Sequence, residues 1–138
     1  MESGRIFVDT NLFLYAASMA PEDAGKKAIA GDVIRNPGLV ISSQVIQEFI
    51  SAALKRPRLG LGEAQIDVWL GFFTPNQVQV LTLPVIRQAV ALRRRYQISH
   101  WDSTIVAAAL AAGCDTLFSE DLSHGQTFDA LTVCNPLI

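Results

Sequence analysis

Four acidic side chains of this chain could act together: Asp9, Glu48, Asp102 and Asp121. Carboxylates crowded into one place repel each other and raise one another's pKa unless a cation neutralises them. Such hard oxygen ligands suit Mg²⁺ or Mn²⁺, and Mg²⁺ also takes water and substrate phosphate as ligands. A metal held in this way can activate water and stabilise the leaving oxygen of a phosphodiester. Whether the four acids meet depends on the elements that carry them.

Asp9 comes directly after residues 6–8, which are predicted to form a short buried strand that turns at once into a helix over residues 11–18. In open parallel sheets, ligands bind beyond the carboxyl ends of the strands, near the point where strand order reverses. Asp9 would stand at that place. The competing interpretation is that Asp9 only caps the following helix, as Asp, Thr and Asn all do readily.

Glu48 lies on a helix predicted over residues 43–55, which follows a second strand over residues 39–41. At 100° per residue, Glu48 falls at the edge of the apolar stripe of this helix. It either points into solvent or leans over the rim of the sheet, because the helix begins so soon after the strand ends.

Asp102 belongs to the first turn of a helix predicted over residues 99–112, which ends at Gly113. Ser99 and Asp102 have the spacing of a capping box, which is a structural explanation. Asp102 also falls at the centre of the face that must be buried, where a carboxylate is costly unless something positive meets it. Asp121 follows a strand over residues 116–118, so the strand-then-carboxylate pattern of the N-terminus is repeated.

The remaining elements alternate between strand and helix, which implies a parallel sheet covered on both faces and an α/β fold. We expect a single domain over residues 1–138, without an internal repeat or a linker. The helix over 84–96 is expected to bury Ile86, Val90 and Leu92. Further helices are predicted over 21–35 (with Ala24, Ala28, Ile29, Val33 and Ile34 inside) and 62–73, and further strands over 78–81 and 131–134.

Composition narrows the class of protein. Half of the 138 residues are apolar and 17% are charged, which excludes a disordered chain. No apolar run approaches the roughly 20 residues of a membrane span, and residues 1–5 lack the features of a signal peptide. Cys114 and Cys134 have no metal spacing and are expected to be reduced thiols. These features favour a cytoplasmic protein.

The net charge of −2 argues against nucleic-acid binding by bulk positive charge. That argument weakens if four acids belong to a metal site, because the rest of the chain then carries +2. Arg93–Arg95 end a helix, where they either complement the helix dipole or contact phosphates. His100 and His124 are isolated, so neither is expected to act as a general base.

Four sequence fragments together resemble the PIN-domain ribonucleases, in particular the VapC-like toxins of bacterial toxin–antitoxin pairs. The likeness covers nearly the whole chain. The fragments are Val-Asp-Thr-Asn at 8–11, Gln-Glu-Phe at 47–49, Trp-Asp-Ser at 101–103 and Gly-Cys-Asp-Thr-Leu-Phe-Ser-Glu-Asp-Leu at 113–122.

The resemblance implies a three-layer α/β/α sandwich with a central parallel sheet of about five strands. It also implies a Mg²⁺- or Mn²⁺-dependent endoribonuclease with Asp9 and Asp102 as the firmest metal ligands, completed by Asp121, while Glu48 ligates the metal or orients water. The family further implies an RNA substrate, a homodimer and a cognate antitoxin that covers the groove. Thr10, Asn11 and Ser119 match supporting polar positions. Trp101 stands where tyrosine is common, and Glu120 is an additional acid.

Two other functions are consistent with the same residues. A phosphatase or phosphotransfer domain would use Asp9 as nucleophile, although position 11 is Asn where one such class has a second Asp. A non-catalytic binding module with a PIN-like fold would use Trp69, Phe72 and Phe73 as its contact surface, since the helix over 62–73 carries more apolar side chains than one core face needs.

Overall fold

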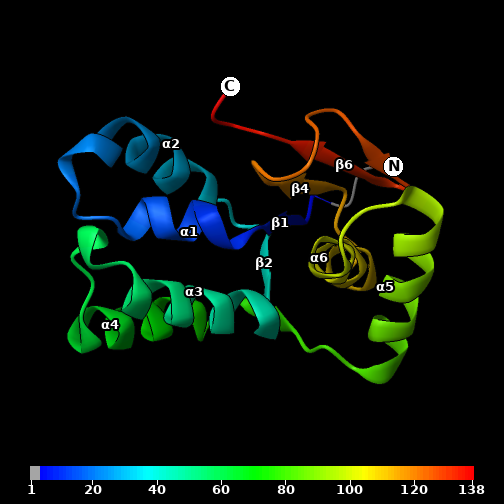
Figure 1. Cartoon of the computed structure of the whole chain (residues 1–138), viewed down its shortest axis with the longest axis horizontal. Helices are drawn as coiled ribbons and strands as arrows, with labels where there is room; N and C mark the ends of the chain where they lie inside the picture. Colours follow the sequence, from blue (N-terminus) through cyan, green and yellow to red (C-terminus); the bar gives the residue numbers. More distant parts are fainter. Residues whose placement is uncertain (1–3) are drawn as a thin grey trace.

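A computed structural model describes residues 4–138. Its centre is a sheet of six strands in the order β3-β2-β1-β4-β6-β5 (Figure 1). Every neighbouring pair is parallel except β5 and β6, which are antiparallel. The five predicted parallel strands are therefore confirmed, and β5 is an additional one. The strands are β1 Ile6–Val8, β2 Leu39–Ser42, β3 Gln77–Gln79, β4 Thr116–Phe118, β5 Thr127–Phe128 and β6 Leu131–Cys134.

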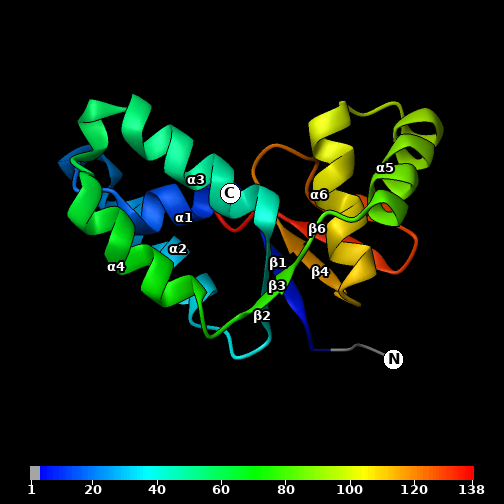
Figure 2. The same ribbon diagram turned by 90° about the horizontal axis from the view of Figure 1, so that it is seen from below.

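Helices cover both faces of this sheet (Figures 1 and 2). One face carries α1 Thr10–Ala17, α2 Ala24–Ile34, α3 Ser43–Lys55 and α4 Glu63–Phe73. The other carries α5 Leu83–Tyr96 and α6 His100–Ala111, which pack against each other. Two short 3₁₀ helices, Pro21–Asp23 and Pro57–Leu59, precede α2 and α4. The predicted three-layer α/β/α arrangement is confirmed.

The strand order reverses at β1. The chain first adds β2 and β3 on one side of β1, and then crosses the other face through α5 and α6 to place β4 on the opposite side. All three residues of β1 are buried because helices cover both of its faces. The carboxyl ends of β1 and β4 thus lie side by side at the switch point, where α/β sheets bind ligands.

Side-chain caps begin the helices that leave the sheet rim. The Ser42 hydroxyl accepts from the backbone N–H of Val45 at 3.2 Å, and the Ser99 hydroxyl accepts from that of Asp102 at 3.1 Å. At the other end of α6, Gly113 adopts φ of +74°, a left-handed conformation that favours glycine. These signals explain why the predicted helix boundaries are close to the observed ones.

Some predicted burial is wrong. On α5 the buried side chains are Val85, Ala89 and Leu92, spaced by four and three, whereas Ile86 is 37% exposed and Val90 only half-buried. The core face of α5 is therefore rotated by one position from the predicted one. On α2 only Ala30 and Ile34 are buried; Ala24, Ala28 and Ile29 face solvent because α2 lies on the outside of α1. The third strand ends at Gln79 rather than at residue 81.

The aromatic residues of α4 belong largely to the core. Phe73 is 1% exposed and makes edge-to-face contacts with Phe13 and Phe49, with ring centroids 5.2 and 5.5 Å apart. Trp69 and Phe72 are half-buried beside it. The predicted contact surface of Trp69, Phe72 and Phe73 is thus wrong for Phe73, and the exposed large apolar side chains of α4 are Val68 and Leu70.

Within residues 4–138, no helix has the length and hydropathy needed to cross a membrane. Cys114 is buried, Cys134 is half-buried, and both are free thiols. Residues 1–3, part of the segment in which no signal peptide is predicted, lie outside the described residues.

Candidate functional site

Asp9 is the buried centre of the carboxyl edge. Its side chain is only 5% exposed, and its Oδ1 accepts from the backbone N–H of Thr10 at 2.7 Å. Its Oδ2 accepts from the hydroxyl of Ser119, at the end of β4, at 2.9 Å. Asp9 therefore caps α1 and also stands at the sheet rim, so capping is not its only position-dependent contact.

Burial raises the pKa of the Asp9 carboxyl to about 6. The hydrogen bonds from Thr10 and Ser119 oppose this shift, and the negative charges of Asp121 and Glu48 add to it. With a pKa of about 6, Asp9 is largely ionised at neutral pH, and a nearby cation would lower this pKa.

Glu48 leans over the rim rather than into solvent. Its Oε2 accepts from the Thr10 hydroxyl at 3.1 Å, and its Oε1 accepts from Gln44 Nε2 at 2.6 Å. Gln44 precedes Glu48 by one helical turn on α3, so it fixes the carboxylate from the same helix face. The Thr10 bond then joins α3 to the start of α1.

Asp121 lies in the loop after β4. Its backbone N–H donates to the Ser119 hydroxyl at 3.1 Å, and the Asn11 amide lies 3.4 and 3.5 Å from its two carboxylate oxygens. Asp121 is an exposed residue, yet partial desolvation of its carboxyl raises its pKa, and the charges of Asp102, Glu120 and Glu48 raise that pKa further. The additional acid, Glu120, accepts a hydrogen bond from the Tyr15 hydroxyl at 2.9 Å.

Asp102 lies on the first turn of α6 and lines neither of the two cavities at this edge. The sequence predicts Asp102 at the centre of the buried face of α6, and in the structure it is half-buried. Its charge reaches Asp121, as the pKa of Asp121 records.

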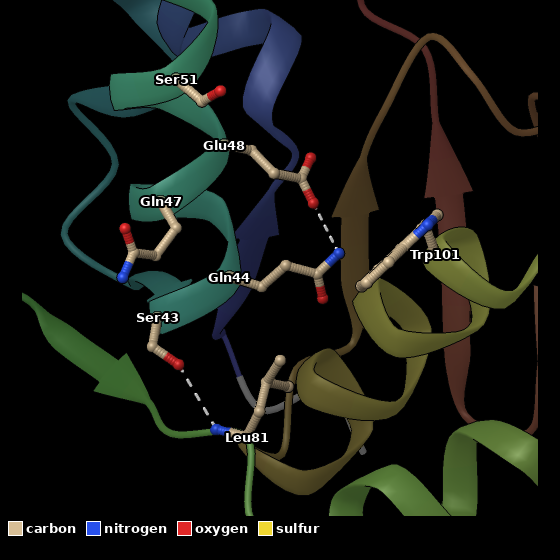
Figure 3. A pocket seen from close by; sticks show the side chains of 7 residues that line it. All are labelled: Ser43, Gln44, Gln47, Glu48, Ser51, Leu81 and Trp101. Atoms are coloured by element: carbon tan, nitrogen blue, oxygen red, sulfur yellow. Dashed lines mark hydrogen bonds between the residues drawn. The ribbon is translucent and has the colours of Figure 1, made fainter.

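Two cavities open at this edge. The smaller, about 300 Å³, brings Asp9, Glu48 and Asp121 together. The larger, about 670 Å³, lies between α3 and the N-terminus of α6 and is lined by Gln44 and Trp101 (Figure 3). Glu48 and Ser51 line both cavities, so the two are adjacent. The remaining residues of the smaller cavity are Thr10, Asn11, Leu14, Ser51, Ala52, Lys55 and Arg56.

Lys55, Arg56 and Gln44 were not predicted as site residues. A detectable signal exists for two of them: Gln44 and Lys55 lie four residues before and seven residues after Glu48, which places all three on one face of α3. Arg56 comes after the helix, where periodicity says nothing about direction. Arg93–Arg95 have a structural role in part, because Arg95 pairs with Asp129 at 3.3 Å.

The donor set fits a hard divalent cation in its chemistry. It consists of oxygen ligands only, and none of the four acids forms an ion pair with a cationic residue in the described part of the chain. Within residues 4–138, no three acidic, histidine or cysteine side chains stand close enough together to enclose an ion. A cation at this edge would therefore depend on small side-chain movements and on ligands from water or substrate.

Solved structures of known proteins share this fold. The chain resembles a toxin–antitoxin complex protein from Klebsiella pneumoniae at 18% identity, with a TM-score of 0.69 over 96% of this chain and 97% of the other. VapC20 of Mycobacterium tuberculosis, described as a toxin that cleaves the sarcin–ricin loop, is 20% identical with a TM-score of 0.67 over 84% and 91%. VapBC2 of Rickettsia felis, bound to a promoter DNA fragment, is 18% identical with a TM-score of 0.65 over 93% and 96%.

No curated protein matches the sequence of this chain. The model of the PIN domain family, however, matches residues 6–127, which include the six helices and the acidic edge up to Asp121. The sequence match and the shared fold agree over the same elements. The chain belongs to the PIN domain family.

Proposed function

We propose that this chain is a Mg²⁺- or Mn²⁺-dependent endoribonuclease, the toxin of a toxin–antitoxin pair. The observation that carries the proposal is that Asp9, Glu48 and Asp121 line one cavity, that the charge of Asp102 reaches Asp121, and that none of the four pairs with a cationic side chain within residues 4–138. The negative charges of Asp121 and Glu48 raise the pKa of Asp9, and a divalent cation would remove this repulsion.

Asp9, Asp102, Asp121 and Glu48 would hold the cation, with Glu48 free to orient the attacking water instead. When bound, Mg²⁺ or Mn²⁺ supplies a water of lowered pKa and stabilises negative charge on the phosphate oxygens. The supporting residues position the acids: Thr10 and Ser119 hold Asp9, Thr10 and Gln44 hold Glu48, and Asn11 orients Asp121.

Lys55 and Arg56 would bind the RNA backbone. They line the acidic cavity and are exposed, so their charges are available to phosphates entering it. RNA binding is compatible with a net charge of −2, because the charges close to the scissile phosphate matter most and two of these are cationic side chains.

The toxin role draws on the comparisons. The structural relatives include toxin–antitoxin complexes and one RNA-cleaving toxin. By that likeness we propose a cytoplasmic homodimer of single-domain chains, residues 1–138, inhibited by a small antitoxin protein.

The test is cleavage of mixed total RNA by the purified protein with Mg²⁺ or Mn²⁺. We expect discrete fragments that disappear with a chelator and that fall at least about 100-fold in rate for Asp9→Asn and Asp102→Asn. Asp67→Asn is the matched control, because Asp67 is an exposed acid of α4 that lines neither cavity. Cleavage that survives chelation and both site substitutions would refute the proposal.

A further inference from the structure

The larger cavity carries an exposed aromatic ring on one wall. The Trp101 side chain projects from the first turn of α6 and is 67% exposed, whereas large apolar side chains are usually buried. It faces α3, which contributes Gln44, Gln47 and Glu48 to the opposite wall (Figure 3). The volume of about 670 Å³ falls within the range of about 300–1,000 Å³ that is typical of small-ligand sites.

An unused hydrogen-bond acceptor lies in the same cavity. Gln44 is 7% exposed, and its Nε2 donates to Glu48 at 2.6 Å, which fixes the direction of the carboxamide. The other atom of that carboxamide, Oε1, is buried and accepts from no residue within 4–138. A buried acceptor without a donor is destabilising, and a bound molecule that supplies a donor to this oxygen would remove that cost.

The position of the cavity identifies the molecule. Glu48 and Ser51 line both this cavity and the acidic one, and Trp101 is the chain neighbour of Asp102. A molecule bound against Trp101 therefore lies next to the place where the phosphodiester would be cut. An accessible ring plus a single directed acceptor suits a nucleobase, which offers a flat face for stacking and an amino group at its edge.

We propose that this cavity is a nucleobase subsite, in which an unpaired RNA base stacks on Trp101 and donates its exocyclic amino group to Gln44 Oε1. Adenine, cytosine and guanine carry such an amino group and uracil does not. The subsite thus selects an amino-bearing base beside the scissile phosphate. The identification of the ligand as RNA rests on the proposed function.

Fluorescence tests this subsite without any cleavage. The chain has two tryptophans, so Trp69→Phe leaves Trp101 as the only indole. In EDTA, oligoadenylate and oligocytidylate pentamers should quench its fluorescence saturably and bind several-fold more tightly than oligouridylate. Gln44→Leu should remove that preference and leave the quenching.

Substitutions of the ring separate stacking from other roles. In the otherwise native protein, Trp101→Ala should weaken binding of labelled oligoadenylate at least about fivefold, while Trp101→Phe stays within about threefold. Unchanged binding by Trp101→Ala, or no quenching by any oligonucleotide, would overturn the proposal. Loss of an oligomer in Trp101→Ala with unchanged RNA binding would also overturn it, because the cavity would then be a protein contact.

The two proposals fail in different ways. Quenching and base preference without cleavage by the native protein would refute the nuclease and support the subsite. Metal-dependent cleavage that is equally fast in the native protein and in Trp101→Ala, with no quenching, would refute the subsite and support the nuclease.

Discussion

The hydroxyl of Ser119 donates to Asp9 Oδ2 at 2.9 Å and joins the ends of two neighbouring strands, β1 and β4, that are 110 residues apart in sequence. The same hydroxyl accepts from the backbone N–H of Asp121 at 3.1 Å. One small side chain thus sets the positions of two of the four acids.

We therefore expect Ser119→Ala to disturb both. The substitution removes a hydrogen bond that lowers the pKa of Asp9, so that pKa should rise above its present value of about 6. The free energy of unfolding should fall by about 1–2 kcal/mol, measured by urea denaturation. Ser123→Ala, an exposed position in the same loop, is the control. Equal stability of the two variants would contradict this role.

Asp9→Asn is expected to stabilise the metal-free protein at neutral pH. Burial raises the pKa of Asp9 from 3.8 to about 6. The folded state binds this proton more tightly than the unfolded state does. Ionisation of Asp9 therefore lowers the free energy of unfolding, and this loss grows as pH rises from about 4 to about 6. The gain for Asp9→Asn should reach at most about 3 kcal/mol above pH 7 and vanish near pH 4. A gain that does not depend on pH would contradict the assignment of this pKa to Asp9.

Cation binding should weaken in acid. A cation must displace the proton of Asp9, so Mn²⁺ affinity should be about tenfold lower at pH 5 than at pH 7 in calorimetric titrations. Residual binding by Asp9→Asn should vary less with pH. The same affinity at both pH values in the native protein would exclude Asp9 as a ligand.

Lys55 and Arg56 should affect RNA binding rather than stability. Both line the acidic cavity and are exposed. Replacing both with Ala should weaken binding of RNA oligonucleotides in EDTA and reduce the slope of log affinity against log salt by about 1–2. Arg87→Ala, an exposed cation of α5 that lines neither cavity, should leave the slope unchanged. An equal loss of RNA affinity in the Lys55/Arg56 double variant and in Arg87→Ala would mean that RNA is attracted to positive charge anywhere on the surface, which would contradict the prediction.

The α4 helix offers a test of core against surface. Phe73→Ala removes a ring that is 1% exposed and packed against Phe13 and Phe49, and it should cost about 3–5 kcal/mol. Val68→Ala, on a side chain that is 71% exposed, should change stability by no more than about 0.5 kcal/mol. A small effect of Phe73→Ala would restore α4 as a contact surface.

The fold was predictable because its signals are local. Short apolar runs bounded by capping residues, such as Ser42 and Ser99, mark strand ends and helix starts, and their alternation dictates a parallel sheet. The antiparallel strand β5 was not predicted because two residues are too few to show an alternation of apolar and polar side chains. The predicted core face of α5 was wrong by one position. Val85 and Ile86 are both apolar, so the sequence does not say which is buried, and only the packing of α5 against α6 decides it.

The part of the site that follows directly after strands was predictable from the sequence. Asp9 and Asp121 follow β1 and β4, so topology alone brings them together. The direction of the Glu48 side chain could not be predicted, because a residue at the edge of a helix can face either solvent or the sheet rim. In the structure, the hydrogen bond from Thr10 of α1 to Glu48 of α3 fixes it toward the rim. Gln44 and Trp101 lie on different helices, so no spacing within one helix reveals that they share a cavity.

The crossing from β3 to β4 has a consequence for biosynthesis. Asp9, Thr10 and Glu48 leave the ribosome early, whereas Ser119 and Asp121 are made only after α5 and α6. Since proteins are made from the N-terminus at about 5–20 residues per second, the acidic edge stays incomplete until β4 and the loop after it have been made. A prematurely terminated chain that lacks β4 can have no assembled site.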